Sequence, residues 1–186
     1  MTHPSTKPKK IFIVGPMGAG KTTIGKQLAK FLGWDFVDSD HEIVARTGVK
    51  IPVIFDVEGE AGFRKREKAV IDELTQRQDL VLATGGGAVL DVDNRNLLRQ
   101  RGVVVYLCAT PEQLYKRTAR DRNRPLLQTD DPLEKIKQLL AQRDPLYRDV
   151  ADIIMETGEE SVRSVVRKLL EHLRHQGIVE LDKKYS

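Results

Sequence analysis

A glycine-rich stretch near the start of the chain carries the groups needed to hold a nucleoside triphosphate. It reads Gly15-Pro16-Met17-Gly18-Ala19-Gly20-Lys21-Thr22 and lies between a short apolar run and a helical pattern, as a phosphate-binding loop does. The glycines let consecutive backbone N–H groups face one anion, and the start of the helix adds partial positive charge. Lys21 supplies a point charge to the β- and γ-phosphates, and the Thr22 hydroxyl can ligate Mg²⁺. A nucleotide site is predicted, but the loop alone does not identify the reaction.

Two carboxylates follow the second apolar run, in the sequence Asp38-Ser39-Asp40. In open α/β folds, ligands bind at the carboxyl ends of the strands, so both side chains are expected at that edge. One carboxylate could bind a metal, and the other could orient an acceptor hydroxyl and take its proton during phosphoryl transfer. The alternative is structural, because Asp is also a favoured residue at the start of a helix.

Three further features could complete a pocket for the acceptor. Gly85-Gly86-Gly87 follows the third apolar run, where a backbone without side chains can approach a ligand and offer N–H donors, although a loose turn would also explain it. Arg64 and Arg143 are each unremarkable alone, since most arginines lie on a solvated face. Together they could grip a carboxylate through bidentate hydrogen bonds.

Three classes of nucleotide-binding protein are compatible with the loop: a small-molecule kinase, a guanine-nucleotide switch and an ATPase module. The chain has no Asn-Lys-x-Asp tetrapeptide, which a guanine-specific switch would carry, and its 186 residues are few for a mechanical ATPase. A kinase needs an acceptor pocket and a lid that excludes water. Residues 120–131 are rich in charge and lack periodicity, which predicts such a mobile loop. A small-molecule kinase is therefore favoured.

Short β-branched runs alternate with helical periodicity along the chain, which predicts parallel strands in an α/β layered fold. The runs are continuously apolar, so we expect them to be buried on both faces of the sheet. Strands are expected at residues 11–14, 36–37, 80–83, 103–107 and 153–155. A first helix should start in the glycine-rich stretch and end at Gly33, with others at residues 40–46, 59–76, 93–100, 111–120, 132–142 and 161–175.

Length and composition indicate one domain with a sizeable core. The net charge is only +4 and aromatic residues make up 5%, which argues against a nucleic-acid partner. The longest apolar run, residues 103–109, is too short to cross a bilayer, so no membrane partner is expected. The single Cys108 and the lack of a signal-peptide core predict a cytoplasmic protein. We expect a flexible leader at 1–9, the domain at 10–175 and a tail at 176–186.

Taken together, the motifs resemble those of the shikimate kinase family in order and spacing over residues 10–173. They are Gly15 to Thr22, Asp38-Ser39-Asp40, Phe55…Gly59-Glu60-x-x-Phe63-Arg64-x-x-Glu67, Gly85 to Val89, Arg124-Pro125-Leu126-Leu127 and Arg143-x-Pro145-Leu146-Tyr147. The resemblance implies a three-layer α/β/α P-loop NTPase fold like that of nucleoside monophosphate kinases. Its five-stranded parallel sheet would have the order 2-3-1-4-5, with helices on both faces and a mobile lid at about residues 117–131.

The same resemblance implies an ATP-dependent kinase that forms shikimate 3-phosphate and ADP on the route through chorismate to the aromatic amino acids. Asp40, Lys21 and Arg124 would be catalytic, and Glu67 would orient Arg64. Acceptor contacts are expected from Asp40, Arg64, Gly85, Gly86, Gly87 and Arg143. ATP contacts are expected from Gly15, Gly18, Ala19, Gly20, Lys21, Thr22, Thr23, Arg117 and Arg124, with Arg117 against the adenine ring. Mg²⁺ is expected on Thr22 and, through water, on Asp38.

The residues specify the reaction class more closely than the acceptor. Gluconate-type and nucleoside monophosphate kinases share the loop and the lid, so they remain alternatives. A non-catalytic nucleotide-binding module also remains open, in which case Asp40, Arg64 and Arg143 would not converge. A monomer is expected.

Overall fold

A five-stranded parallel sheet forms the centre of the molecule in the computed structural model, which describes residues 9–121 and 124–180. Its strands are β1 (Lys10–Val14), β2 (Asp35–Asp38), β3 (Leu80–Ala83), β4 (Val103–Cys108) and β5 (Ile153–Glu156). The order is β2-β3-β1-β4-β5 and every neighbouring pair is parallel, which confirms the predicted fold class and strand order. Most of the leader predicted at 1–9 and of the tail predicted at 176–186 lies outside the described residues.

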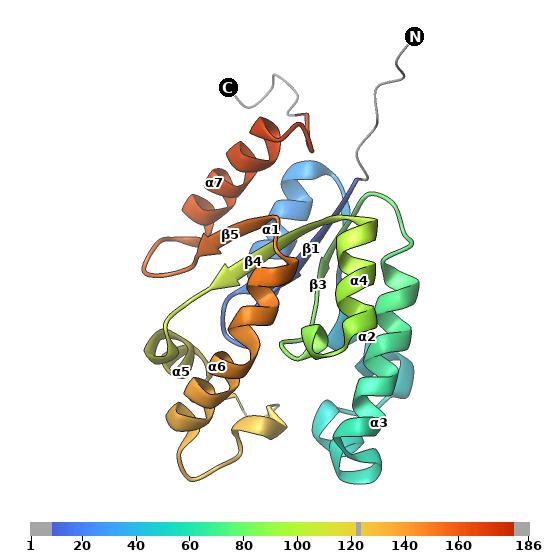
Figure 1. Cartoon of the computed structure of the whole chain (residues 1–186), viewed down its shortest axis with the longest axis vertical. Helices are drawn as coiled ribbons and strands as arrows, with labels where there is room; N and C mark the ends of the chain where they lie inside the picture. Colours follow the sequence, from blue (N-terminus) through green and yellow to red (C-terminus); the bar gives the residue numbers. More distant parts are fainter. Residues whose placement is uncertain (1–8, 122–123, 181–186) are drawn as a thin grey trace.

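Helices cover both faces of the sheet (Figure 1). They are α1 (Lys21–Leu32), α2 (Ser39–Thr47), α3 (Ile51–Leu74), α4 (Val92–Arg101), α5 (Pro111–Thr118), α6 (Pro132–Val150) and α7 (Val162–His175), with short 3₁₀ helices η1 (Ala88–Leu90) and η2 (Pro125–Leu127). No helix within the described ranges is long and apolar enough to span a membrane.

Successive residues of the central strands enter two separate hydrophobic cores, because side chains alternate between the faces of a strand. In β1, Ile11 and Ile13 pack in the core that includes residues of α1 and α7. Phe12 and Val14 pack in the core that includes residues of α3 and α4. The predicted two-sided burial is correct for β1, β3 and most of β4. It is wrong for β5, where Ile154 is 44% exposed, and for β2, which has no buried residue. The physical reason is that β2 and β5 lie at the two edges of the sheet.

Two helix boundaries differ from the predictions, and both place site residues on helices. Helix α3 begins at Ile51 rather than at Gly59, which has φ 72° and ψ 178° and interrupts the helix with a kink. Exposed Val53 and Val57 obscure the amphipathic pattern of its first part. Helix α6 continues past residue 142 to Val150 with Pro145 inside it, although proline usually ends a helix.

Candidate active site

The glycine-rich loop connects β1 to α1, and its lysine side chain bonds to the backbone of the loop. Gly18 and Gly20 have φ values of 86° and 93°, which favour glycine, and Gly20 is the residue at which α1 starts. Lys21 Nζ donates to the carbonyl oxygens of Gly15 and Pro16 at 2.7 and 2.9 Å. Burial, helped by the positive charge of Arg124, lowers the pKa of Lys21 to about 8. The loop therefore holds a desolvated cation where the sequence predicts a phosphate chain.

Asp38 caps the next helix, which is the structural alternative considered from the sequence, and also bonds to the start of α1. Its Oδ1 accepts from the backbone N–H groups of Asp40 and His41 at 2.9 and 3.2 Å and so caps α2. Its Oδ2 accepts from the Thr22 hydroxyl at 2.6 Å. A hydroxyl and a carboxylate side by side form an oxygen donor set that fits Mg²⁺, which usually completes its shell with substrate phosphates and water.

A cavity beside this loop brings together all the residues predicted to contact the acceptor. Its polar lining consists of Asp40, Arg64, Glu67, Gly85, Gly86, Gly87, Arg124 and Arg143. They come from α2, α3, the turn after β3, the segment before η2, and α6. Convergence of Asp40, Arg64 and Arg143 is the arrangement that a nucleotide-binding module without an acceptor would lack.

Apolar side chains form the rest of the cavity wall; several belong to the motif series, but none was predicted to contact the acceptor. They are Met17, Ile51, Phe55, Phe63, Pro125 and Leu126. The rings of Phe55 and Phe63 face each other with centroids 5.0 Å apart, across the kink at Gly59. Two parts of α3 therefore meet at the cavity, which explains why the first part of this helix matters for the site.

Several charged atoms in the cavity are buried without a hydrogen-bond partner among the described residues. They are Asp40 Oδ1, Arg64 Nε, Glu67 Oε2 and Arg143 Nε. Arg143 is 3% exposed, and Arg64 is held through its other nitrogens by Glu67 at 3.0 Å and Glu60 at 3.2 Å. Buried polar atoms in proteins are nearly always paired, so this cluster is prepared for a ligand with both acidic and hydroxyl groups.

Burial also changes the acid strength of the two carboxyl groups in the cavity. Burial, reinforced by the negative charge of Asp38, raises the pKa of Asp40 above its ordinary value. Burial likewise raises the pKa of Glu67 to about 7, against the opposing charge of Arg64. Asp40 therefore holds a proton more readily than an exposed aspartate, as a base that accepts a proton from a substrate should.

The turn Gly85–Gly87 lies so close to these side chains that only glycine fits. A Cβ added to Gly85 would lie 2.7 Å from both Asp40 Oδ1 and Glu67 Oε2, and one added to Gly87 would collide with the Arg64 guanidinium. Gly86 lies against Arg143, whose Nη1 would be 3.6 Å from an added Cβ. The turn is therefore part of the cavity, and the alternative of a loose turn is wrong.

Hydrogen bonds fix this turn on both sides, through residues for which the sequence predicted no role in the site. On one side, Ser39 Oγ accepts from Gly85 N–H at 3.0 Å, and the Tyr147 hydroxyl donates to the Gly86 carbonyl oxygen. On the other, Asn94 Nδ2 donates to Ala88 O at 3.0 Å. Their sequence positions did not predict these contacts: Ser39 lies between two aspartates, and Asn94 and Tyr147 are helix residues.

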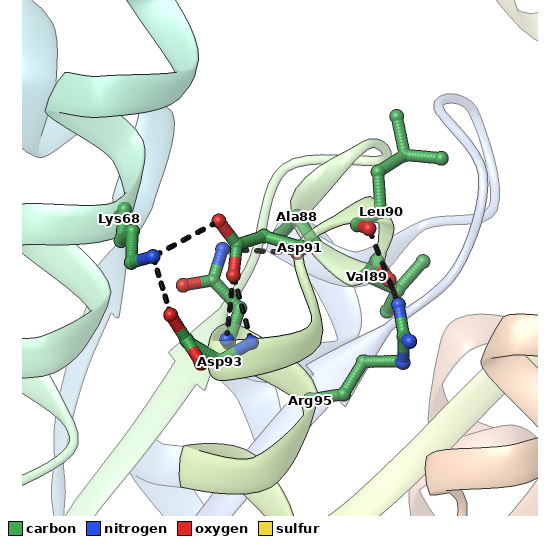
Figure 2. Close-up of polar contacts among 8 residues, drawn as sticks. Lys68, Ala88, Val89, Leu90, Asp91, Asp93 and Arg95 are labelled. Carbon is green, nitrogen blue, oxygen red and sulfur yellow. Dashed lines mark hydrogen bonds and ion pairs between the residues drawn. The ribbon is translucent and has the colours of Figure 1, made fainter.

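Figure 2 shows how the end of the turn is attached to α4 and α3. Arg95 Nη1 donates to the carbonyl oxygens of Val89 and Leu90 at 2.7 and 3.2 Å. Asp91 caps α4, and Lys68 of α3 forms ion pairs with Asp91 at 3.3 Å and Asp93 at 2.6 Å. The exposed ion pairs add little stability. The Arg95 bonds matter more for the site, because they hold the backbone that continues from the glycines.

The two arginines predicted near the nucleotide occupy different places. Arg117 donates to Gly18 O at 3.1 Å and to Gly158 O at 2.9 Å, so it links the glycine-rich loop to the segment after β5. Arg124 forms an ion pair with Asp121 at 2.9 Å and lines the acceptor cavity while its charge acts on Lys21. Residues 122–123 of the lid predicted at 117–131 lie outside the described residues.

Comparisons with known proteins agree on one family. The family model described as shikimate kinase matches residues 17–174. A shikimate kinase of Nitrosococcus oceani is 61% identical over 164 residues, covering 88% of this chain and 86% of that protein. One of Halorhodospira halophila is 59% identical over 176 residues, covering 95% and 99%. The solved structure of a shikimate kinase from Acinetobacter baumannii in complex with shikimate superposes with a TM-score of 0.90 at 52% identity, covering 94% of this chain and 97% of that one.

Proposed function

The chain belongs to the shikimate kinase family, and on that premise we propose how its residues divide the transfer of the γ-phosphoryl group of ATP to the 3-hydroxyl of shikimate. Family membership sets aside the alternatives of a gluconate-type kinase, a nucleoside monophosphate kinase and a non-catalytic module. The observation that carries the division of roles is the cluster of partnerless buried charges beside the phosphate loop, because its signs and positions match a hydroxylated acid.

The substrate carboxylate binds Arg64 and Arg143, whose buried Nε atoms lack partners among the described residues. Two guanidinium groups satisfy a carboxylate with charge-assisted hydrogen bonds and fix its orientation. The N–H groups of Gly86 and Gly87 contact the ring hydroxyls, supported by the close approach of that backbone to the charged groups. Asp40 binds the reacting hydroxyl through its free Oδ1.

Phosphoryl transfer then depends mainly on position and charge. The 3-hydroxyl oxygen forms a bond to the γ-phosphorus while the bond from that phosphorus to the β–γ bridging oxygen breaks and ADP leaves. The hydroxyl proton passes to Asp40, whose raised pKa supports the role of base. Lys21 and Arg124 neutralise charge on the transferring group, supported by their positions at the loop and at the cavity wall.

The nucleotide lies along the glycine-rich loop. Its phosphates are held by the backbone of Gly15, Gly18, Ala19 and Gly20 together with Lys21, Thr22 and Thr23, and its adenine ring lies against Arg117. Thr22 would hold Mg²⁺, with Asp38 acting through water, which the adjoining oxygens of these residues support. When bound, Mg²⁺ supplies positive charge that stabilises the phosphate oxygens. We also propose a monomer in the cytoplasm, because one chain provides every residue of the site and a lone cysteine suits a reducing compartment.

An ADP-release assay with ATP and Mg²⁺ tests this function. Shikimate, gluconate and AMP are added separately, and ³¹P NMR identifies the product. Shikimate alone should stimulate ADP formation, with phosphate on its 3-hydroxyl. Stimulation by gluconate or AMP instead, or ADP formation that is independent of any acceptor, would contradict the proposal.

A further inference from the structure

Tyr147 of α6 is completely buried, and its hydroxyl group has a specific partner in the acceptor site. The side chain is 0% exposed, and the hydroxyl donates to the carbonyl oxygen of Gly86. Burial raises the pKa of Tyr147 to about 12, although the nearby Arg143 charge lowers it, so the hydroxyl stays protonated as a donor. A buried tyrosine hydroxyl needs a partner, and this one donates to the glycine turn, while Arg143 of its own helix also interacts with it.

The position of Tyr147 on α6 connects this bond to the residue that we propose binds the substrate carboxylate. Arg143 and Tyr147 are four residues apart on the same helix, so they lie on one face; the Tyr147 hydroxyl bonds to Gly86, and the Arg143 guanidinium lies beside it. Pro145 stands between them and cannot donate a backbone hydrogen bond. The packing of the two side chains against one glycine therefore sets the distance between α6 and the turn.

The geometry of the peptide bond extends the effect of this hydroxyl to the next residue. In a planar trans peptide the carbonyl of Gly86 and the N–H of Gly87 point in opposite directions. Fixing the Gly86 carbonyl toward α6 therefore fixes the Gly87 N–H in the other direction. Neither the Gly86 nor the Gly87 N–H donates to another residue of the described part of the chain, so both remain available to a ligand.

We propose that Tyr147 is a positioning residue for the acceptor, which acts through Gly86 to aim the N–H groups of the glycine turn and to set their distance from Arg143. The proposal rests on the proposed function only in taking the turn as part of the acceptor site. Tyr147 lines a small pocket with Pro16 and Met17 of the nucleotide loop, but its hydroxyl bonds to the glycine turn and not to that loop, so we expect its main effect on the acceptor.

The neighbouring Tyr106 provides a matched control. Its ring packs against that of Tyr147 with centroids 5.0 Å apart, and it is 1% exposed. Its hydroxyl donates to Asp144 Oδ1 at 2.6 Å and not to the glycine turn. Replacing either tyrosine by phenylalanine removes one buried hydroxyl and one hydrogen bond from the same part of the core, but only one of the two bonds reaches the turn.

The test compares Tyr147→Phe with Tyr106→Phe and the unaltered protein in steady-state kinetics, with thermal unfolding as a check on folding. Tyr147→Phe should raise the KM for shikimate about tenfold, the effect of one lost hydrogen bond, and leave the KM for ATP unchanged. Tyr106→Phe should leave both KM values within about twofold of the unaltered protein. Hydrogen exchange of the Gly85 amide, which donates to Ser39 Oγ in the same turn, should become faster in Tyr147→Phe alone.

Three results would overturn the inference: an unchanged KM for shikimate in Tyr147→Phe, an equal rise in both KM values, or the same rise in Tyr106→Phe. If Tyr147→Phe lowers the melting temperature while both KM values stay the same, Tyr147 only packs. Failure of the proposed function would look different, because the unaltered protein would then show no shikimate-dependent ADP formation. If Tyr147→Phe does not fold, hydrogen exchange in the unaltered protein decides: the Gly85 amide of the fixed turn should be protected, and fast exchange there would count against the proposal.

Discussion

The nucleotide loop and the acceptor cavity lie side by side, but their polar side chains differ in whether they have hydrogen-bond partners. In the loop, Lys21 is bonded to two carbonyl oxygens of its own segment, and Thr22 is bonded to Asp38. In the cavity, four charged side chains each keep a buried atom with no partner among the described residues. These atoms are Asp40 Oδ1, Arg64 Nε, Glu67 Oε2 and Arg143 Nε.

This difference separates general from specific recognition. The side chains of Lys21 and Thr22 already have partners, and the loop offers backbone N–H groups that suit any nucleoside triphosphate. An unpaired buried polar group costs about 1–3 kcal/mol, so the cavity is held in a costly arrangement that a fitting acceptor relieves. A site of this kind rejects analogues that lack one of the expected groups more strongly than an apolar pocket would. Acceptor specificity should therefore lie in the cavity, and variants there should leave ATP binding intact.

The largest effect should come from Asp40→Asn, which keeps the shape of the side chain and removes the base. We expect kcat to fall by two or more powers of ten, the usual scale for loss of such a group, while the KM for ATP stays the same. Steady-state ADP formation at saturating ATP and shikimate measures this. Near-normal turnover would remove Asp40 from the mechanism, and a parallel loss of ATP binding would break the separation between the two regions.

Removal of the arginines should affect the acceptor alone. Arg143→Ala and Arg64→Ala should each weaken shikimate binding by about 1.5–3 kcal/mol, or roughly 10–150-fold, since each removes a charged hydrogen bond. We expect Arg143→Ala to lose more shikimate affinity than Arg64→Ala, because Arg143 is 3% exposed whereas the Arg64 side chain is 22% exposed. Calorimetric titration with shikimate and with ATP gives both affinities. An unchanged shikimate affinity in both variants would refute the carboxylate clamp.

The pH dependence of the two substrates should differ. The pKa of Lys21 in the free protein is lowered to about 8, so above that pH the lysine is increasingly neutral and must take up a proton when ATP binds. The KM for ATP should therefore rise above pH 8, by at most about tenfold per pH unit, while the KM for shikimate stays flat. Calorimetry at pH 8.5 in buffers of different ionisation enthalpy should detect proton uptake with ATP. A flat KM for ATP up to pH 9.5 would contradict the prediction.

The smallest effect concerns stability and comes from Glu67→Gln. The pKa of Glu67 is raised to about 7, so stability from its protonated form is present below its ordinary pKa of 4.5 and is lost as the pH rises through 7. The loss is at most about 3 kcal/mol, and glutamine does not undergo it. The melting temperature of Glu67→Gln relative to the unaltered protein should therefore increase between pH 5 and pH 8, by a few degrees.

Glu60→Gln is the matched control for this measurement. Glu60 also accepts a hydrogen bond from Arg64, at 3.2 Å, but its side chain is 49% exposed. The melting temperature of Glu60→Gln relative to the unaltered protein should not increase between pH 5 and pH 8. A constant difference between Glu67→Gln and the unaltered protein from pH 5 to pH 8 would show that Glu67 does not titrate as described.

The sequence determined those parts of the molecule that depend on neighbours along the chain. The glycine-rich loop, its lysine and threonine, and the five strands could be predicted because their geometry follows from residue types a few positions apart. The boundaries of α3 and α6 could not, since exposed valines hide one pattern and Pro145 suggests an end that tertiary packing overrides. The motif series identified the family, and the strand order that it implies was confirmed.

Only the tertiary structure decided what surrounds the acceptor. Arg64 and Arg143 are 79 positions apart, and although the motif resemblance assigned both to the acceptor, only the structure shows that they line one cavity. The hydrogen bonds of Ser39 and Tyr147 with the glycine turn could not be predicted either, because the sequence does not show which group a hydroxyl will meet in the folded chain. The physical reason is that the cavity is built where the carboxyl ends of parallel strands meet helices from distant parts of the chain, so its contacts are set by packing rather than by spacing.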